Sequence, residues 1–256
     1  MAIFNGTIFS KELWMETELI AILPTIKADG GVTKSKNVLY LLHGISENHT
    51  KWLRMSDIEE YANNYGVAVI MPNGLRSFYC DMEYGLKYFT YISKELPKIC
   101  EDIFNIPNKR ENKFIAGLSM GGYGAFKCAF TYPEDYAGCG SFSGAVDTDF
   151  VKKYIFNSPQ YSKEAFAILG DDIKPDNDLF YLSSLANNSK YDLKVYQSCG
   201  KQDFLYTSNI KFKNHLEKLN FNYKFMEWDG EHNWSFWRKS IEYLFDYFFN
   251  NLNESK

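Results

Sequence analysis

The sequence predicts an α/β protein, with a mostly parallel sheet covered by helices on both faces and an antiparallel strand pair at its N-terminal end. Apolar, β-rich runs alternate with helical patterns along most of the 256 residues, as in proteins built from βαβ units. The run VLYLLHG (38–44) is apolar and ends in a glycine turn, which is typical of buried parallel strands. The opening runs AIFNGTIFS and ETELIAILPT precede this alternation and are expected to pair antiparallel.

Local signals delimit the next elements of the first half of the chain. In SDIEEYANNYG, Ser56 or Asp57 is expected to cap a helix and Gly66 to end it, and VAVIMP is the following strand. Residues 84–104 have helical spacing, and Pro97 is expected to kink or interrupt that helix because proline lacks an amide hydrogen. KFIAGLS then predicts a strand, and MGGYGAFKCAFTYP predicts a helix.

The second half repeats the alternation after one long interruption. YAGCGSFSG is a predicted strand, but residues 145–190 have no strand pattern and are rich in Asp, Asn, Lys and Tyr, which predicts a helical, loop-rich insertion. DLKVYQSCG (192–200) is a strand, a helix extends to about residue 220, NYKFMEW (222–228) is a strand, and an aromatic helix starts at Trp234. No repeat or linker marks a boundary, so residues 1–256 are expected to form a single domain.

Charge and composition exclude several classes of function. The formal net charge is −4, and Lys and Arg form no basic block, which argues against a nucleic-acid partner. No apolar run approaches the roughly 20 residues that span a membrane, and the N-terminus lacks the pattern of a signal peptide. The cysteines are odd in number and never spaced as C-x-x-C, so we expect free thiols in a reducing cytoplasm: Cys80, Cys100, Cys128, Cys139 and Cys199.

The strongest chemical signal is the G-x-S-x-G match around Ser119, which runs from Gly117 to Gly121. In this motif the glycines permit a very tight turn from a strand into a helix, and the turn exposes the serine oxygen at the carboxyl end of the sheet. A chance match is the alternative, because short patterns with two glycines recur by accident. The strand pattern before Ser119 and the small-residue helix pattern after it favour a catalytic nucleophile.

A serine hydroxyl needs an imidazole to take its proton, and in this architecture the histidine follows the last strand. The chain has four histidines, and His232 in WDGEHNWSFW is the one that lies after NYKFMEW. A polar residue that merely caps the last helix is the alternative for His232. His215 is expected on the surface of a helix, His43 ends a buried strand, and His49 lies in the polar loop SENHT.

The carboxylate that orients the imidazole is expected after the preceding strand, and Asp203 in KQDF follows DLKVYQSCG directly. Acids of the insertion precede that strand, and the acids beside His232 are too near it in sequence for the usual geometry. These competing acids are Asp171, Asp172, Asp176, Asp178, Asp229 and Glu231.

The oxyanion that forms during acyl transfer needs two backbone N–H donors. Met120 follows the nucleophile and supplies one, and Ile45, which follows Gly44 after an early strand, is the candidate for the other. H-E-x-x-H, Walker A and early G-x-G-x-x-G motifs do not occur in the sequence. With few histidines and no paired cysteines, we expect neither a metal site nor an organic cofactor.

Several segments resemble the putative-esterase family of α/β-hydrolases, most closely the bacterial tributyrin esterases: LLHG, VIMPNGLRSFYCDMEYG, GLSMGGYGAF, YPEDYAGCGSFSG and GEHNW. The likeness runs from about residue 2 to about residue 250. Relatives in this family are S-formylglutathione hydrolases (esterase D), feruloyl and acetyl-xylan esterases, and mycobacterial mycolyltransferases. The resemblance implies an α/β-hydrolase fold and a serine carboxylesterase that acts on short acyl esters of small molecules.

The family roles fall on the residues already selected, with Ser119, Asp203 and His232 as the triad and with Ile45 and Met120 as oxyanion donors. The insertion at 145–190 is expected to form part of a lid over the acyl pocket. Feruloyl or acetyl esters of plant carbohydrate are an alternative substrate class. S-formylglutathione is another, although PNGLRSFYCDMEYG differs from the stretch typical of those hydrolases. A non-catalytic binding protein would be expected to lack a triad member, and the oligomeric state is not predicted.

Overall fold

The computed structural model describes residues 1–25, 34–155 and 159–250. In these residues one sheet contains eight strands in the order β1-β2-β4-β3-β5-β6-β7-β8. At one end of this order β1 pairs antiparallel with β2, and β2 pairs antiparallel with β4. All the other neighbouring strands pair parallel, so the sheet is mostly parallel, as predicted. The strands are β1 (Ala2–Ser10), β2 (Met15–Leu23), β3 (Asn37–Leu42), β4 (Val67–Pro72), β5 (Lys113–Leu118), β6 (Gly138–Phe142), β7 (Lys194–Gly200) and β8 (Asn222–Trp228).

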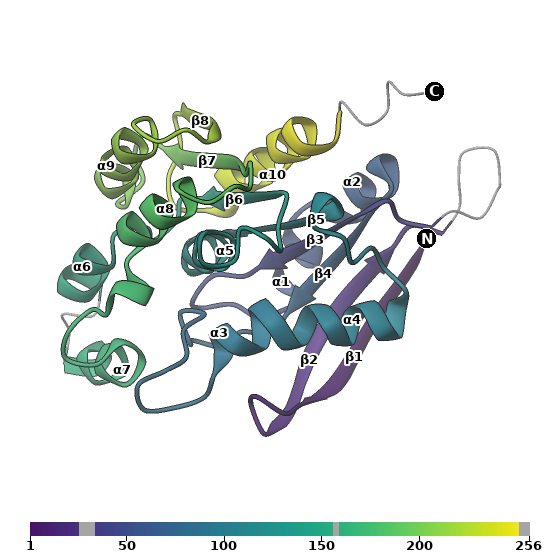
Figure 1. Ribbon diagram of the computed structural model, residues 1–256, viewed down its shortest axis with the longest axis horizontal. Helices are drawn as coiled ribbons and strands as arrows, with labels where there is room; N and C mark the ends of the chain where they lie inside the picture. Colours follow the sequence, from purple (N-terminus) through teal and green to yellow (C-terminus); the bar gives the residue numbers. More distant parts are fainter. Residues whose placement is uncertain (26–33, 156–158, 251–256) are drawn as a thin grey trace.

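Helices cover both faces of the sheet, because the central strands bury side chains on both faces. In β3, Tyr40 and Leu42 join one apolar cluster, while Leu39 and Leu41 join the other. Figure 1 shows α5 (Met120–Thr131) and α4 (Leu96–Phe104) on one face. The opposite face carries α1 (Lys51–Met55), α2 (Ile58–Tyr65) and α10 (Trp234–Phe249).

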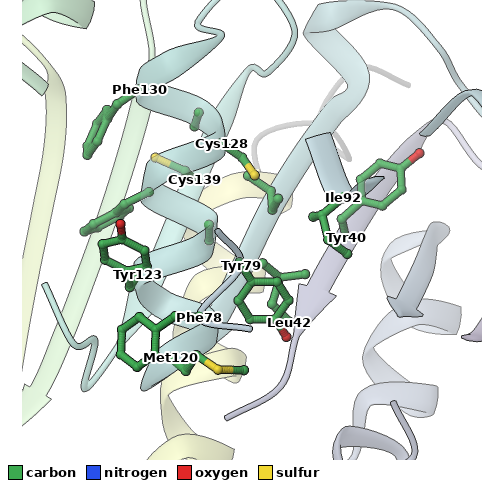
Figure 2. Close-up of a cluster of buried hydrophobic side chains, with 14 of the residues drawn as sticks. Tyr40, Leu42, Phe78, Tyr79, Ile92, Met120, Tyr123, Cys128, Phe130 and Cys139 are labelled. Atoms are coloured by element: carbon green, nitrogen blue, oxygen red, sulfur yellow. The ribbon is translucent and has the colours of Figure 1, made fainter. Parts of the chain in front are cut away.

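The first of these clusters packs α5 against the sheet and against the loop after β4. Figure 2 shows Met120 and Tyr123 of α5 near Phe78 and Tyr79 of that loop, while Cys128 lies further along the helix, near Cys139 of β6. All five cysteines of the chain are unpaired, as predicted, and the structure buries every one of them. Within the described residues, no helix is both long and apolar enough to cross a membrane.

The structure contains both helical segments predicted at 56–66 and 84–104, with differences at their starts. Asp57 is the N-cap residue of α2 without a capping side-chain bond, and Gly66 ends the helix in the left-handed region at φ 65°. The segment predicted at 84–104 begins at residue 88, as α3 (Tyr88–Thr90), and becomes a π-helical turn, η1 (Tyr91–Glu95), before α4. Pro97 lies in the first turn of α4, directly after the π-helical turn, so the predicted interruption precedes the proline.

Between β6 and β7 the described residues form helices and loops, as the composition of 145–190 predicts. The elements are α6 (Thr148–Phe150), η3 (Val151–Ile155), α7 (Pro159–Leu169), η4 (Pro175–Asn177) and α8 (Leu179–Asn187). Elsewhere the described residues also form η2 (Arg110–Asn112), α9 (Tyr206–Leu216) and the turn that joins β1 to β2. The predicted helix to about residue 220 therefore ends at residue 216. Treating residues 1–256 as one domain stays a prediction.

Candidate active site

The candidate nucleophile Ser119 lies at the turn from β5 into α5, in a strained backbone conformation. Its φ is 53° and its ψ is −116°, a region that non-glycine residues rarely adopt. A Cβ atom on Gly117 would lie 2.5 Å from backbone atoms of Gly121, and one on Gly121 would lie 2.5 Å from the carbonyl oxygen of Leu42. Only glycine fits at these two positions, which is the physical reason for the G-x-S-x-G pattern.

Hydrogen bonds to the neighbouring strand hold this strained turn in place. The Ser119 N–H donates to the carbonyl oxygen of Phe142 over 2.9 Å, and the Ser119 carbonyl accepts from the N–H of Ala145 over 3.1 Å. Both partners lie in or just after β6, next to β5 in the sheet. The strain is therefore balanced by contacts to the sheet, so the serine hydroxyl has a fixed direction.

The loops that follow β7 and β8 are joined directly, which brings Asp203 and His232 together. Gly200 ends β7 so close to the next loop that a Cβ atom there would lie 2.2 Å from the carbonyl oxygen of Gly230. The Gln202 N–H donates to that same carbonyl over 3.0 Å, and the Gln202 side chain accepts from the Gly230 N–H over 2.7 Å. Parallel neighbouring strands end at the same edge of the sheet, so these loops meet beside Ser119.

A continuous chain of hydrogen-bond contacts links the three predicted residues. His232 Nε2 lies 3.0 Å from Ser119 Oγ, and His232 Nδ1 lies 2.8 Å and 3.1 Å from the two carboxylate oxygens of Asp203. The Asp203 side chain is fully buried, and the His232 side chain is 18% exposed. Because an ionised carboxylate can only accept, Nδ1 donates to Asp203, and Nε2 is then free to accept the proton of Ser119.

Asp203 is itself held by a backbone donor. The Leu205 N–H donates to Asp203 Oδ1 over 2.8 Å. Aromatic rings enclose the imidazole: the ring of Trp237 meets His232 edge-on at 5.0 Å, and that of Phe204 lies at 4.6 Å. These contacts fix the orientation of the imidazole between the serine and the carboxylate.

None of the competing groups is bonded to His232. Asp229 instead accepts from Gln202 over 3.4 Å, and Asp178 caps α8 by accepting from the Phe180 N–H. The other competing acids have exposed side chains: Asp171, Asp172, Asp176 and Glu231. His215 lies on α9 and is half-buried, with Nε2 3.0 Å from Ser183 Oγ, so its ring reaches the surface only in part. Its neighbours Phe180 and Phe212 cover the ring, a tertiary contact that helical spacing alone does not reveal.

The two predicted oxyanion donors differ in how they are oriented. Met120 is the first residue of α5, where an N–H has no partner within the helix and lies at the positive end of the helix dipole. Ile45 N–H belongs to the planar Gly44–Ile45 peptide, whose C=O and N–H point in opposite directions. Whatever holds the Gly44 carbonyl therefore fixes the direction of the Ile45 N–H.

That carbonyl is held by His43. His43 Nδ1 lies 2.7 Å from the Gly44 oxygen, and the Glu47 N–H donates to the same oxygen over 3.1 Å. The other ring nitrogen of His43, Nε2, accepts from the Gly74 N–H over 2.9 Å. The ring is 1% exposed, and burial lowers the pKa of His43 from an ordinary 6.5 to about 4. His43 is therefore neutral near pH 7, with its proton on Nδ1.

Glu47 connects the Gly44 loop to the loop of the candidate base. Its Oε2 accepts from the Gly44 N–H over 3.2 Å, and its Oε1 accepts from the indole N–H of Trp234 over 2.8 Å. Trp234 is two residues beyond His232. The sequence analysis did not select Glu47. The only feature of the sequence that points to its contact with Gly44 is its position three residues after that glycine.

A cleft of about 790 Å³ opens beside Ile45. Arg76, from the loop after β4, forms a two-pronged ion pair with Glu164 of α7 over 2.6 Å and 2.7 Å, and both side chains line the cleft. Arg76 also lies 3.4 Å from the carbonyl oxygen of Ile45. The insertion is thus attached to the Ile45 loop. The apolar part of the lining comes from Ile45, Leu75, Met82, Leu86 and Tyr88.

Within the described ranges, no three His, Cys, Asp or Glu side chains come together in a way that could hold a metal ion. The arrangement that the structure does contain is a serine, an imidazole and a buried carboxylate in series. Such an arrangement is able to activate a hydroxyl for nucleophilic attack on an electrophilic carbonyl.

A family model described as putative esterase matches residues 10–244 of the chain. The chain belongs to the putative esterase family. This esterase is 35% identical over 262 residues to an acetyl esterase of Caldicellulosiruptor saccharolyticus, in an alignment that covers 96% of the chain and 98% of that relative. Together, the family and this relative identify a carboxylic ester hydrolase.

Solved structures similar to the esterase have the α/β-hydrolase fold. A fluorophosphonate-binding serine hydrolase of Staphylococcus aureus, solved with substrate bound, is 33% identical with a TM-score of 0.86, and the match covers 97% of the esterase and 98% of that chain. An S-formylglutathione hydrolase of the same organism is 34% identical with a TM-score of 0.85, over 97% and 99% of the two chains.

Proposed function

We propose that this esterase is a serine carboxylesterase that hydrolyses short-chain acyl esters through an acyl-enzyme intermediate. The observation that carries the proposal is the series of contacts from Ser119 Oγ through His232 to the buried Asp203, at 3.0 Å and 2.8 Å. The strained backbone of Ser119 directs its hydroxyl out of the turn, as a nucleophile requires. A non-catalytic binding protein would have no need to maintain this strain.

In the proposed reaction His232 takes the proton of Ser119 as the serine oxygen bonds to the ester carbonyl carbon. The negative charge that develops on the carbonyl oxygen is stabilised by the N–H groups of Ile45 and Met120. Protonated His232 is stabilised by Asp203 and then protonates the departing alcohol, which breaks the ester bond. Water, deprotonated by His232, attacks the carbonyl carbon of the acyl-enzyme. The bond from that carbon to Ser119 Oγ then breaks, His232 returns its proton to Oγ, and the acid is released.

The preferred substrate class is an ester with a small acyl group, and the 35% identical relative named acetyl esterase supports it. The cleft beside Ile45 has room for an alcohol group much larger than a short acyl chain. A thioester substrate is the second candidate, supported by the 34% identical S-formylglutathione hydrolase. Feruloyl or acetyl groups on carbohydrate are a third, and the apolar cleft lining is compatible with them. The five unpaired cysteines fit the cytoplasmic location that we also propose.

Replacement of Ser119 tests the mechanism. Ser119→Ala should lower kcat on p-nitrophenyl acetate by several orders of magnitude without loss of the fold, because the missing oxygen is the nucleophile. A fluorophosphonate probe should label wild-type protein and should fail to label this variant, as read by intact mass. Retention of more than about a tenth of wild-type activity would contradict the assignment of the nucleophile.

A panel of p-nitrophenyl esters, methyl ferulate and S-formylglutathione tests the substrate class. We expect kcat/KM to be highest from acetate to butyrate and to fall by octanoate over several chain lengths, because each methylene changes binding by only about 1–3 kcal/mol. Preference for methyl ferulate, for S-formylglutathione or for chains beyond eight carbons would refute the short-chain proposal. The nucleophile assignment does not depend on that result.

A further inference from the structure

Strand β1 is the outermost strand of the sheet in the described residues, and it pairs only on its β2 side (Figure 1). An edge strand presents a row of backbone N–H and C=O groups that are available to another extended chain. The side chains of β1 are exposed as well: Ile3 is 41% exposed, Phe4 is 49% exposed and Phe9 is 54% exposed. Apolar side chains and open backbone groups therefore occur together on this edge.

Natural sheet edges are usually protected by charged residues or proline, and β1 has neither among its nine residues, AIFNGTIFS. The opposite edge strand, β8, carries Lys224 and Glu227. The two edges of the same sheet thus differ in the feature that prevents strand pairing. A strand without charge can also meet its own copy without repulsion between like charges.

The order of residues in β1 is symmetrical in polarity about Gly6. Reading outward from Gly6, polar residues come first, Asn5 and Thr7, and then apolar residues on both sides, before small residues end the strand. In an antiparallel pair centred on Gly6, Phe4 would face Ile8 of the second copy, and Asn5 would face Thr7. Like polarity thus meets like polarity from Ile3 to Phe9, and only the end pair, Ala2 with Ser10, differs; such self-complementarity is what a two-fold interface requires.

We propose that the esterase forms a homodimer in which two β1 strands pair antiparallel about a two-fold axis at Gly6, so that the two sheets become one continuous sheet. The pairing satisfies the open backbone groups of both edges and covers their apolar side chains. Phe4 already packs against Phe104 of α4 at 5.6 Å, and Ile8 packs against the core. The Phe4–Ile8 contacts across the axis extend this apolar layer from one subunit into the next.

A cysteine at the axis tests the register. A Cβ atom on Gly6 meets nothing within 4 Å in the monomer, so Gly6→Cys does not disturb the fold. In the proposed pair the two introduced cysteines are directly opposite, and their Cα atoms, about 4.5–5.5 Å apart, lie within the range that a disulfide bridges. The native thiols are buried, and burial raises the pKa of Cys100 and Cys128 to about 12, so they do not compete.

Under mild oxidation Gly6→Cys should migrate as a covalent dimer on non-reducing gels, and dithiothreitol should reverse it. Asn214→Cys on α9, at the far end of the sheet, is the matched control and should stay monomeric on the gel. Equal cross-linking of the two variants would overturn the proposal.

A pair of charge variants tests the interface in solution by light scattering after gel filtration. Wild-type protein should have about twice the chain mass of 29.8 kDa. Asn5→Lys with Thr7→Lys places like charges opposite each other at both positions and should reduce the mass to that of one chain. Asn5→Lys with Thr7→Glu places opposite charges there and should remain dimeric. A monomeric wild-type protein, a dimeric double-lysine variant or a monomeric lysine–glutamate variant would each overturn the proposal.

Discussion

His43 is the most informative residue to replace, because it acts on the proposed reaction without touching the substrate. Its Nδ1 holds the Gly44 carbonyl over 2.7 Å, and its Nε2 accepts from the Gly74 N–H over 2.9 Å. His43→Leu keeps the buried volume but removes both bonds. The Gly44 carbonyl retains the Glu47 N–H, whereas the buried Gly74 N–H loses its partner.

The expected effects of His43→Leu follow from this geometry. Loss of one oxyanion donor costs about 10²–10³ in kcat in other serine hydrolases. Here the Ile45 N–H is present but less firmly directed, so we expect kcat on p-nitrophenyl acetate to fall between about 10-fold and 10³-fold, with KM little changed. Stability should fall by about 2–4 kcal/mol, which combines one lost hydrogen bond with one unpaired buried N–H.

The pH dependence of unfolding gives an independent signature of His43. Burial lowers its pKa to about 4 in the folded protein, against about 6.5 in the unfolded chain. Between these values only the unfolded chain binds the proton, so the contribution of His43 to stability is present above pH 6.5 and is lost as the pH falls to 4. The slope is about 1.4 kcal/mol per pH unit, or about 3 kcal/mol over the window.

Urea unfolding of wild-type protein and His43→Leu at several pH values between 4 and 7 measures this contribution as a difference of slopes. Carboxylates titrate equally in both proteins, so their effect cancels. His43→Gln, which keeps a donor and an acceptor, should recover part of kcat. If His43→Leu loses stability but keeps kcat within about threefold of wild type, His43 has a structural role only, and the argument from the planar peptide fails.

Two further predictions concern the groups that hold the proposed machinery in place. Asp203→Asn should lower kcat about 10³–10⁴-fold, because Asp203 orients His232. Asp229 is not bonded to His232, so Asp229→Asn should lower kcat far less. If steady-state assays rank the two variants the other way, Asp229 is the orienting acid. Glu47→Ala should lower kcat about tenfold because it releases both Gly44 and Trp234, and Glu47→Gln should recover most of it, since one amide oxygen still accepts. Equal kcat values for Glu47→Ala and Glu47→Gln would contradict the bridging role of Glu47.

The sequence predicts the strands and the three candidate catalytic residues where short stretches of the chain determine the backbone by themselves. The pattern around Ser119 requires glycine at two positions for steric reasons that the structure reproduces. The strands are short and apolar because parallel strands are buried on both faces, so their order along the chain could be read directly. His232 and Asp203 could be selected because the loops after neighbouring parallel strands share one edge of the sheet.

What the sequence does not predict depends on contacts between distant segments. The sequence places His43 at the end of a buried strand. It does not show that His43 bonds to Gly74, because this bond joins the ends of β3 and β4, which come together only in the folded chain. Pro97 predicts an interruption of the helix, but neither its exact place nor its π-helical form can be read from helical spacing. The ion pair between Arg76 and Glu164 joins residues 88 positions apart.

The proposed catalytic residues and the proposed dimer interface lie at different parts of the sheet, so catalytic activity should not depend on pairing at β1. Ser119, Asp203 and His232 follow β5, β7 and β8, whereas β1 is the edge strand at the opposite end of the strand order. Between them lie β2, β4 and β3, which bury side chains on both faces. A rigid, close-packed element transmits little change when an exposed edge strand loses its partner. The double-lysine variant of β1 should therefore keep wild-type kcat/KM as a monomer, and a large loss of activity would mean that pairing at β1 reaches the oxyanion loop after β3.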